Sequence, residues 1–171
     1  MLLKDLGLDF KVAAQEIDES YPTELPIKDV AEYIAVKKAS AYSIKTNELI
    51  ITADTVVIGE KTILGKPKDE NEAIATLEKL SNKTHNVTTG VCLKTINKQI
   101  SFSQTTEVAF DIITAEEIKY YVSRFQPLDK AGSYAIQEWI GMIGIKSIKG
   151  DYYNVVGLPL HALWQSLKEF K

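Results

Sequence analysis

Residues 48–69 read ELIITADTVVIGEKTILGKPKD. Two short apolar runs in this stretch, residues 49–51 and 56–58, are typical of a strand, and Asp54 lies between them. A carboxylate in such a setting is costly to bury unless another group pairs with it. Lys66 follows in Gly-Lys-Pro, which is typical of a turn. The stretch predicts either a strand and a facing turn that hold a metal and a phosphate, or a strand-edge Asp54 paired with a surface Lys66.

The length of 171 residues predicts a single domain, residues 1–171. The formal net charge of -3 at pH 7 gives no basic surface, so we expect no binding to nucleic-acid polymers. No apolar run approaches the roughly 20 residues of a membrane span, and the N-terminal residues lack a signal-peptide pattern. Cys92 is the only cysteine, which excludes an internal disulfide and fits a reducing compartment. We therefore expect a cytoplasmic protein that does not bind membranes.

The spacing of apolar residues predicts alternating helices and strands early in the chain and paired strands later. The predicted helices are residues 1–6, 29–42, one that begins at Asp69, 114–126 and one that begins near Pro159. The predicted strands, besides the central stretch, are residues 8–13, 84–95, 99–110, 133–137 and 142–148. Together these elements predict an α/β fold, a mixed, twisted sheet with strands in both directions and flanking helices.

Several polar residues outside the central stretch are candidates for a site. Residues 16–19 include three carboxylates, which repel one another unless a cation or solvent lies near, so either a solvated loop or a cation site fits. Lys37 and Lys38 are adjacent and point about 100° apart on their predicted helix, so only one shares the direction of the apolar side. Gln137 ends an apolar run, where its amide could read the edge of a base or bond to backbone at a rim.

His85 and His161 are the only histidines of the chain. Neither has a cysteine or a second histidine nearby, so we expect no zinc site. His85 begins a predicted strand among threonines, and we expect it to be a polar residue at the strand edge.

Short motifs follow one another in order from about residue 50 to residue 160. They are TADTVV at 52–57, GKP at 65–67, LS-x-x-TH-x-V-x-TGV at 80–91, P-x-DKAG at 127–132, AIQ at 135–137 and GDY-x-NVVGLP at 150–159. Together these motifs resemble those of the Maf family of nucleoside-triphosphate pyrophosphatases. That family is similar in fold to the inosine-triphosphate pyrophosphatases, so the resemblance implies a mixed α/β sheet with a deep cleft between two lobes.

The resemblance also implies an activity. Members of the family hydrolyse a nucleoside triphosphate to the monophosphate and pyrophosphate with a divalent cation, Mg²⁺ or Mn²⁺. Asp54 matches the catalytic acid/base of the family, and Glu19 matches an acidic loop residue near the metal, so Glu19 and Asp54 are the implied metal ligands. A general base and a metal ligand are both compatible with Asp54. The implied partner is a nucleoside triphosphate, and a homodimer is a candidate assembly.

The implied substrate-binding residues fall into two groups. Thr55 and Gln137 match positions tied to the choice of base. The residues implied to bind the rest of the nucleotide, either as phosphate-binding lysines or as part of the matching P-x-DKAG motif, are Lys38, Lys66, Asp129 and Lys130. A Thr after the Asp, with Ile-Gln in the later motif, resembles the branch that acts on dTTP and UTP. Two alternatives remain, a pyrophosphatase for 7-methyl-GTP or another modified nucleotide, and a nucleotide-binding regulator without turnover.

The resemblance is incomplete at the N-terminus. Family members begin with a strand that leads to Ser-x-Ser-Pro-Arg-Arg, a loop that grips phosphate and helps to select the nucleotide. This chain starts at Met1-Leu2-Leu3, where the helix after that loop would be under way, so we expect a domain without that strand and loop. A central strand lost from a sheet leaves unpaired backbone and an exposed apolar face. We expect the 171-residue chain to be poorly stable or weakly active by itself.

Overall fold

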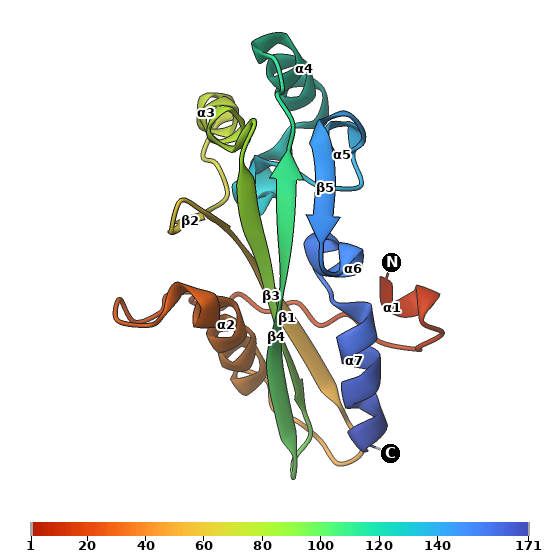
Figure 1. The fold of residues 1–171 in the computed structure, drawn as a ribbon. Coiled ribbons are helices and arrows are strands. Elements are labelled where there is room, and N and C mark those ends of the chain that lie inside the picture. The colour runs from red at the N-terminus through yellow and green to blue at the C-terminus, as the bar shows by residue number, and fades with distance from the viewer. Residues whose placement is uncertain (1, 171) are drawn as a thin grey trace.

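The fold is organised around one sheet, in a computed structural model that describes residues 2–170. Within these residues the sheet has five strands in the order β2-β1-β3-β4-β5 (Figure 1). The strands are β1 (Ile50–Gly59), β2 (Thr62–Leu64), β3 (Thr84–Lys94), β4 (Gln99–Phe110) and β5 (Ile145–Lys149). The long strands β3 and β4 run through most of the height of the molecule, with α4 above their upper end, and helices lie around both halves of the sheet.

The helices gather into two groups around the two halves of the sheet. Around the upper half lie α3 (Glu70–Leu80), α4 (Ala115–Phe125), α5 (Trp139–Gly144) and the short turns η2 (Pro127–Asp129) and η3 (Ala131–Ser133) (Figure 1). Around the lower half lie α1 (Leu2–Asp5), η1 (Ile27–Asp29), α2 (Val30–Ser40), α7 (Leu160–Leu167) and η4 (Lys168–Phe170), with α6 (Tyr152–Val156) between the two groups. The predicted α/β fold, a sheet flanked by helices, is confirmed.

The strand directions differ from the predicted mixture. Every pairing in the described sheet is antiparallel: β1 with β2, β1 with β3, β3 with β4 and β4 with β5. Parallel neighbours require a crossover that carries the chain back along the sheet. Here the connecting helices α3 and α4 contact each other at one end of the sheet. The chain therefore returns to the sheet at the end where it left, and the next strand runs antiparallel to its neighbour.

Two of the predicted strands are wrong, and a third is displaced. Residues 8–13 form no strand, because no neighbouring strand pairs with them within the described chain, and Val12 is 70% exposed. Residues 133–137 form no strand of the sheet. Residues 133–136 are buried beside α4, where the Ala135 amide donates to the Tyr121 hydroxyl at 3.2 Å. The run at 142–148 begins as part of α5, and the strand itself is Ile145–Lys149.

The starts of α3 and α4 are set by side-chain caps, whereas Asp29 forms no such bond at the start of α2. Thr114 and Glu117 form the reciprocal capping box at the start of α4, and Gln126 ends that helix in the left-handed conformation before Pro127. The Asp69 carboxylate accepts a hydrogen bond from the Glu72 amide at 2.8 Å and starts α3. Such caps satisfy backbone donors that a helix end leaves without partners, so the sequence locates these ends well.

The alternation of β1 places neighbouring residues on opposite sides of the sheet. Thr52 faces α2, where its hydroxyl donates to the Ala35 carbonyl at 2.6 Å. Val56 packs against buried apolar residues of α2 on the same face. Val57 belongs instead to the large core on the other face, with residues of α3 and α4. By the same alternation Asp54 faces α2 and Thr55 faces the opposite side. The outer edge of β1 at these two residues has no described strand beside it, because β2 pairs only with residues 57–59.

Helix α2 lies unusually close to β3 at Gly90, the residue paired with Asp54 across the two strands. A Cβ atom at Gly90 would lie 2.2 Å from the Glu32 backbone nitrogen and 2.3 Å from the Ala31 carbonyl carbon. The helix that carries Lys38 therefore rests directly on the strand backbone next to Asp54.

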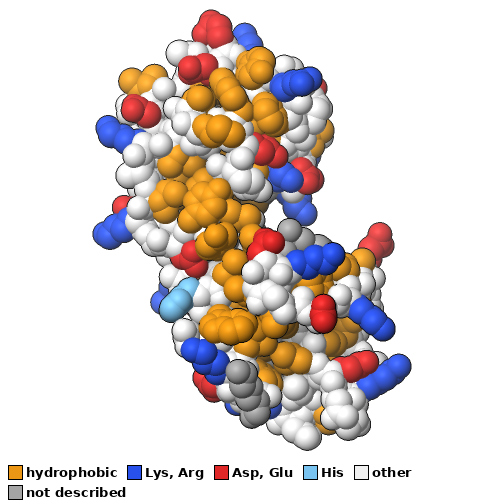
Figure 2. Space-filling model, turned by 90° about the vertical axis from the view of Figure 1, so that its right-hand side faces the viewer, with side chains coloured by type: hydrophobic (Ala, Val, Ile, Leu, Met, Phe, Trp, Pro, Cys, Tyr) orange, Lys and Arg blue, Asp and Glu red, His pale blue; other side chains and the backbone are white. Residues whose placement is uncertain are grey.

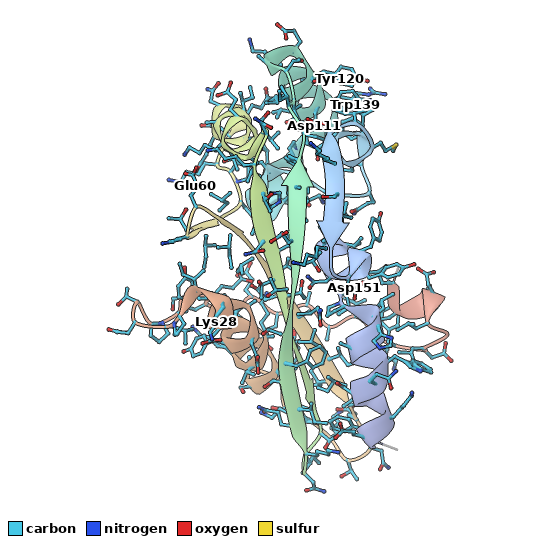
Figure 3. All side chains as sticks on the ribbon, viewed as in Figure 1. Lys28, Glu60, Asp111, Tyr120, Trp139 and Asp151 are labelled. Carbon is cyan, nitrogen blue, oxygen red and sulfur yellow. The ribbon has the colours of Figure 1, made fainter. Side chains whose placement is uncertain are left out.

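The surface combines charged groups with apolar side chains. Figure 2 shows the side on which α5, α6 and α7 lie, with hydrophobic side chains over both the upper and lower parts and a narrower waist between them. At the top of the molecule, Tyr120 of α4 packs edge to face on Trp139 of α5, with ring centres 4.9 Å apart (Figure 3). Among residues 2–170, none of the helices has the length and apolar character needed to cross a membrane.

Candidate active site

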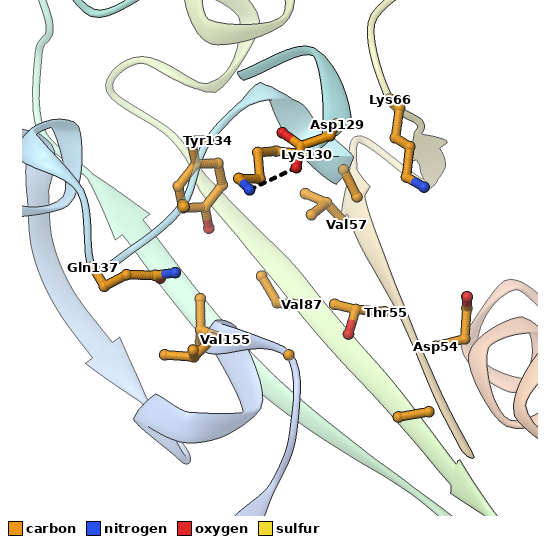
Figure 4. Close-up of a pocket in the computed structure, with 15 residues that line it drawn as sticks. Asp54, Thr55, Val57, Lys66, Val87, Asp129, Lys130, Tyr134, Gln137 and Val155 are labelled. Carbon is orange, nitrogen blue, oxygen red and sulfur yellow. Dashed lines mark hydrogen bonds and ion pairs between the residues drawn. The ribbon is translucent and has the colours of Figure 1, made fainter. Parts of the chain in front are cut away.

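A cavity of about 300 Å³ lies between the two groups of helices, at the open edge of β1 (Figure 4). Its walls come from β1, the turn after β2, η2 and the segment that follows it, β3 and the end of α6. The residues of the wall include Asp54, Thr55, Lys66, Asp129, Lys130 and Gln137, which are six of the site residues predicted from the sequence. The predicted cleft between two lobes is present, and these side chains converge on it.

Lys38 joins the two predicted metal-binding carboxylates. Its Nζ atom lies 2.6 Å from Asp54 Oδ1 and 2.7 Å from Glu19 Oε1. The Asp54 side chain is 14% exposed, whereas that of Glu19 is 51% exposed, so the cluster extends from the interior to the surface. Lys37 points away and pairs with Asp18 at 3.0 Å. The predicted divergence of the two lysines is therefore observed, and Lys38 is the one directed into the site.

The environment shifts the pKa values of all three groups. Burial raises the pKa of Asp54 above its usual value, and this outweighs the opposing influence of the hydrogen bond from Lys38. The hydrogen bond from Lys38 lowers the pKa of Glu19. Burial alone would lower the pKa of Lys38, but its bonds to Asp54 and Glu19 outweigh burial and raise that pKa. Two carboxylates around one ammonium group leave an excess of negative charge.

This excess charge fits a divalent cation. Mg²⁺ and Mn²⁺ prefer oxygen ligands, and Mg²⁺ commonly takes one or two carboxylates together with substrate phosphates. Glu19 and Asp54 supply that donor set. The described part of the chain contains no group of three or more His, Cys, Asp or Glu side chains arranged to hold a metal. A metal at Glu19 and Asp54 would thus need oxygen ligands besides these two carboxylates, and phosphate oxygens could supply them.

Further charged groups lie along the upper rim of the cavity. Lys66 extends toward the cavity above Asp54, and its charge lowers the pKa of both Asp54 and Glu19 (Figure 4). Lys130 Nζ pairs with Asp129 Oδ2 at 2.8 Å, and this bond lowers the pKa of Asp129. The charged wall therefore includes two lysines, and the partly buried Lys38 pairs with Asp54 of the same wall.

The other end of the cavity is mostly apolar. Val87 and Val155 contribute to it, and Thr55 and Gln137 lie on opposite sides of these two residues (Figure 4). Gln137 lies in the turn before α5 rather than at the end of a strand, yet its amide still points into the cavity. The cavity thus has a charged end at Asp54 and Lys66 and an apolar end with two hydrogen-bonding side chains.

Tyr134 lines the cavity and was not identified as a site residue from the sequence. Its hydroxyl is the partner of the His85 side chain. The prediction of a strand-edge His85 is wrong: the ring is 3% exposed, and its Nε2 lies 2.7 Å from the Tyr134 hydroxyl. Burial lowers the pKa of His85 to about 4, so the ring is neutral at pH 7. His85 and Val87 lie two residues apart on one strand, and this alternation was the available signal that His85 faces the interior.

Thr89 and Asn154 lie within the motifs at 80–91 and 150–159, but the sequence assigned neither of them a role in a site. Thr55 Oγ1 lies 2.8 Å from Thr89 Oγ1, and the Thr89 hydroxyl donates to the Asn154 carbonyl at 3.0 Å. Thr89 and Asn154 are both fully buried. A threonine within a predicted strand carries no chemical signal by itself, because the pairing of β1 with β3 decides which side chain it meets.

The chain is similar to known proteins along nearly its whole length. A family model described as Maf-like protein matches residues 1–170. A dTTP/UTP pyrophosphatase of Bacteroides thetaiotaomicron is 47% identical over 171 residues, which cover 98% of this chain and 89% of the relative. Proteins of the same name from Phocaeicola vulgatus and Flavobacterium psychrophilum are each 49% identical, over 98% and 94% of this chain and 89% and 84% of their own lengths.

Proposed function

The chain belongs to the Maf-like protein family, and we propose that it hydrolyses dTTP and UTP to the monophosphate and pyrophosphate. The observation that carries this proposal is the ion cluster at the cavity, in which Lys38 bridges Asp54 and Glu19 at 2.6 Å and 2.7 Å. A reactive carboxylate, a cation and a spare negative charge are thereby concentrated at one end of a cavity whose other end suits a base.

The two ends of the cavity orient the nucleotide. The base enters the apolar end, between Thr55 and Gln137, where an apolar wall removes ring surface from water and two polar groups select the ring edge. The phosphates extend along the charged wall toward Lys66 and Lys38, whose ammonium groups offset phosphate charge. This orientation places the phosphate next to the sugar beside Asp54.

Asp54 acts as the general base. A water molecule in line with the bridge between the α- and β-phosphates attacks the α-phosphorus, and its proton passes to the Asp54 carboxylate. A new bond forms from the water oxygen to the α-phosphorus, the bond to the bridging oxygen breaks, and pyrophosphate leaves with the bonding electrons. Burial of Asp54 raises its pKa and makes it a better proton acceptor than an exposed carboxylate.

Glu19 and Asp54 would hold a divalent cation, Mg²⁺ or Mn²⁺, together with phosphate oxygens. When bound, such an ion neutralises phosphate charge and polarises the phosphoryl group under attack. Lys38 keeps Glu19 and Asp54 next to each other before the ion and substrate arrive.

A substrate panel tests the proposal. Pyrophosphate release is measured with dTTP, UTP, CTP, GTP and 7-methyl-GTP, with Mg²⁺ and after removal of the metal by EDTA. We expect release from dTTP and UTP that depends on the metal. Release from 7-methyl-GTP alone would place the chain in a different substrate class, and tight nucleotide binding without any release would identify a regulator instead of an enzyme.

The pH profile of a Lys38→Met variant tests the role of Asp54. A general base must be deprotonated, so kcat/KM falls as the pH drops through the pKa of Asp54. The Lys38 ammonium holds that pKa down, so its removal raises the pKa further and moves the acid limb of the profile to higher pH. The control is Lys37→Met, because Lys37 pairs with Asp18 and not with Asp54. An acid limb at the same pH in both variants would argue against Asp54 as the base.

A further inference from the structure

The hydroxyl groups of Thr55 and Thr89 form a chain with a fixed direction. A threonine hydroxyl has a single proton to donate. The Thr89 proton is used in the bond to the Asn154 carbonyl, because a carbonyl oxygen can only accept. In the 2.8 Å bond between the two hydroxyls, Thr55 must therefore be the donor and Thr89 the acceptor. The Thr55 proton points away from the cavity, and only lone pairs of Thr55 Oγ1 remain for a ligand.

The end of this chain is held rigidly. The Asn154 side-chain amide donates to the Val87 carbonyl and to Thr106 Oγ1, each at 2.9 Å. Asp151 caps the start of α6 by accepting from the Tyr153 amide at 2.8 Å. The Asn154 carbonyl accepts bonds from the Thr89 hydroxyl and from the Gly157 amide, each at 3.0 Å. Because Asn154 is fully buried, rotation of its peptide group would break both bonds without replacement by water. The acceptor that orients Thr89 is thus fixed by β3, β4 and the helix cap.

The Thr55 oxygen is also accessible from the cavity. Thr55 forms part of the cavity wall, and Gly157 is the neighbouring wall residue after α6. A Cβ atom at Gly157 would lie 3.7 Å from Thr55 Oγ1, so the absence of a side chain there leaves the oxygen uncovered. Figure 4 shows the Thr55 hydroxyl at the apolar end of the cavity, on the side opposite Gln137.

We infer that Thr89 and Asn154 are positioning residues that make Thr55 a pure hydrogen-bond acceptor, so that the site selects a pyrimidine with a ring N–H over one with a bare ring nitrogen. Uracil and thymine carry a proton on N3, whereas N3 of cytosine carries a lone pair. The lone pairs of Thr55 Oγ1 attract the N3 proton of uracil or thymine and repel the N3 lone pair of cytosine. This inference rests on the proposed function only in that a pyrimidine nucleotide occupies the cavity.

A Thr89→Val variant tests the inference. Valine keeps the size of threonine but offers no acceptor, so the Thr55 hydroxyl can turn and donate its proton into the cavity. We expect the preference for UMP over CMP, measured as the ratio of dissociation constants by titration calorimetry, to fall about tenfold. The ratio of kcat/KM for UTP and CTP should fall by the same factor. Thr89→Ser retains the hydroxyl and should keep the preference.

Thr88→Val is the matched control. Thr88 is the neighbouring residue of the same strand, is 1% exposed, and shares a 2.9 Å hydroxyl bond with Thr105 on the other face of the sheet. It should lose a similar amount of stability and keep the UMP preference. Thr55→Val, which leaves the Thr89–Asn154 bond in place, should lose the preference even if Thr89→Val fails to fold.

The outcomes separate the two claims. An unchanged UMP-to-CMP ratio in folded Thr89→Val and Thr55→Val, or equal binding of UMP and CMP by the unchanged chain, overturns the inference whether or not triphosphates are hydrolysed. If UMP preference is present and depends on Thr89, but no triphosphate yields pyrophosphate, the inference stands and the proposed hydrolysis fails.

Discussion

The Asp54→Asn variant is expected to release pyrophosphate from dTTP and UTP about a thousandfold more slowly than the unchanged chain. Asparagine has nearly the shape of aspartate, but it cannot accept a proton from the attacking water, and it lacks the charge that would attract a metal. The variant should still fold, because Lys38 keeps its 2.7 Å ion pair with Glu19. The measurements are kcat with saturating Mg²⁺ and the melting temperature, which should remain close to that of the unchanged chain.

Asp18→Asn serves as the control for this prediction. Like Asp54→Asn, it removes one negative charge, here from the acidic loop next to Glu19. Asp18 pairs with Lys37 and does not belong to the cavity wall. Its activity should remain unchanged. A folded Asp54→Asn protein with the same kcat as Asp18→Asn would contradict the assignment of Asp54 as the general base.

The Gly90→Ala variant is expected to lose stability and activity together. A Cβ at Gly90 would lie 2.2 Å from a backbone atom of α2, and backbone cannot move aside as the end of a flexible side chain can. The helix must shift, at a cost of about 3 kcal/mol, which lowers the melting temperature by roughly 10 °C. Because α2 carries Lys38, the same shift should separate Lys38 from Asp54 and lower kcat at temperatures where the variant is folded.

Gly65→Ala provides the comparison for stability. A Cβ at Gly65 meets no atom within 4 Å, so the same substitution should leave the melting temperature nearly unchanged. Differential scanning calorimetry of the two variants measures the difference directly. Equal melting temperatures would mean that α2 does not rest on Gly90 as closely as described.

Local signals in the sequence identified the parts of the fold that depend on local structure. The caps at Asp69 and Thr114 are formed by side chains within one turn of the helix, and both were predicted correctly. The hairpin of β3 and β4 was recognised from two β-rich runs joined near residues 97–98. Asp54 was recognisable because a carboxylate among apolar strand residues needs a partner, and Lys38 is one.

The remaining features depend on contacts between distant segments. Residues 133–137 have the composition of a strand, but they pack beside α4, where Tyr121 binds their backbone. The buried position of His85 is set by Tyr134, which lies far along the chain. The Thr55–Thr89 contact depends on the register of β1 and β3. No local pattern specifies such partners, so the sequence alone placed the candidate residues without the network that orients them.

The alternation at Asp54 and Thr55 has a consequence for how this protein can change. One peptide bond separates Asp54, the proposed general base, from Thr55, the residue proposed to contact the base of the nucleotide. The two side chains leave the strand on opposite faces, and both reach the wall of the cavity at its edge. If these roles hold, we expect substitution at residue 55 to alter the preferred nucleotide and to leave the proposed general base in place. Gain or loss of one residue within β1 would instead exchange the two sides and disable both. We therefore expect β1 to tolerate substitutions at these positions but not the insertion of a residue.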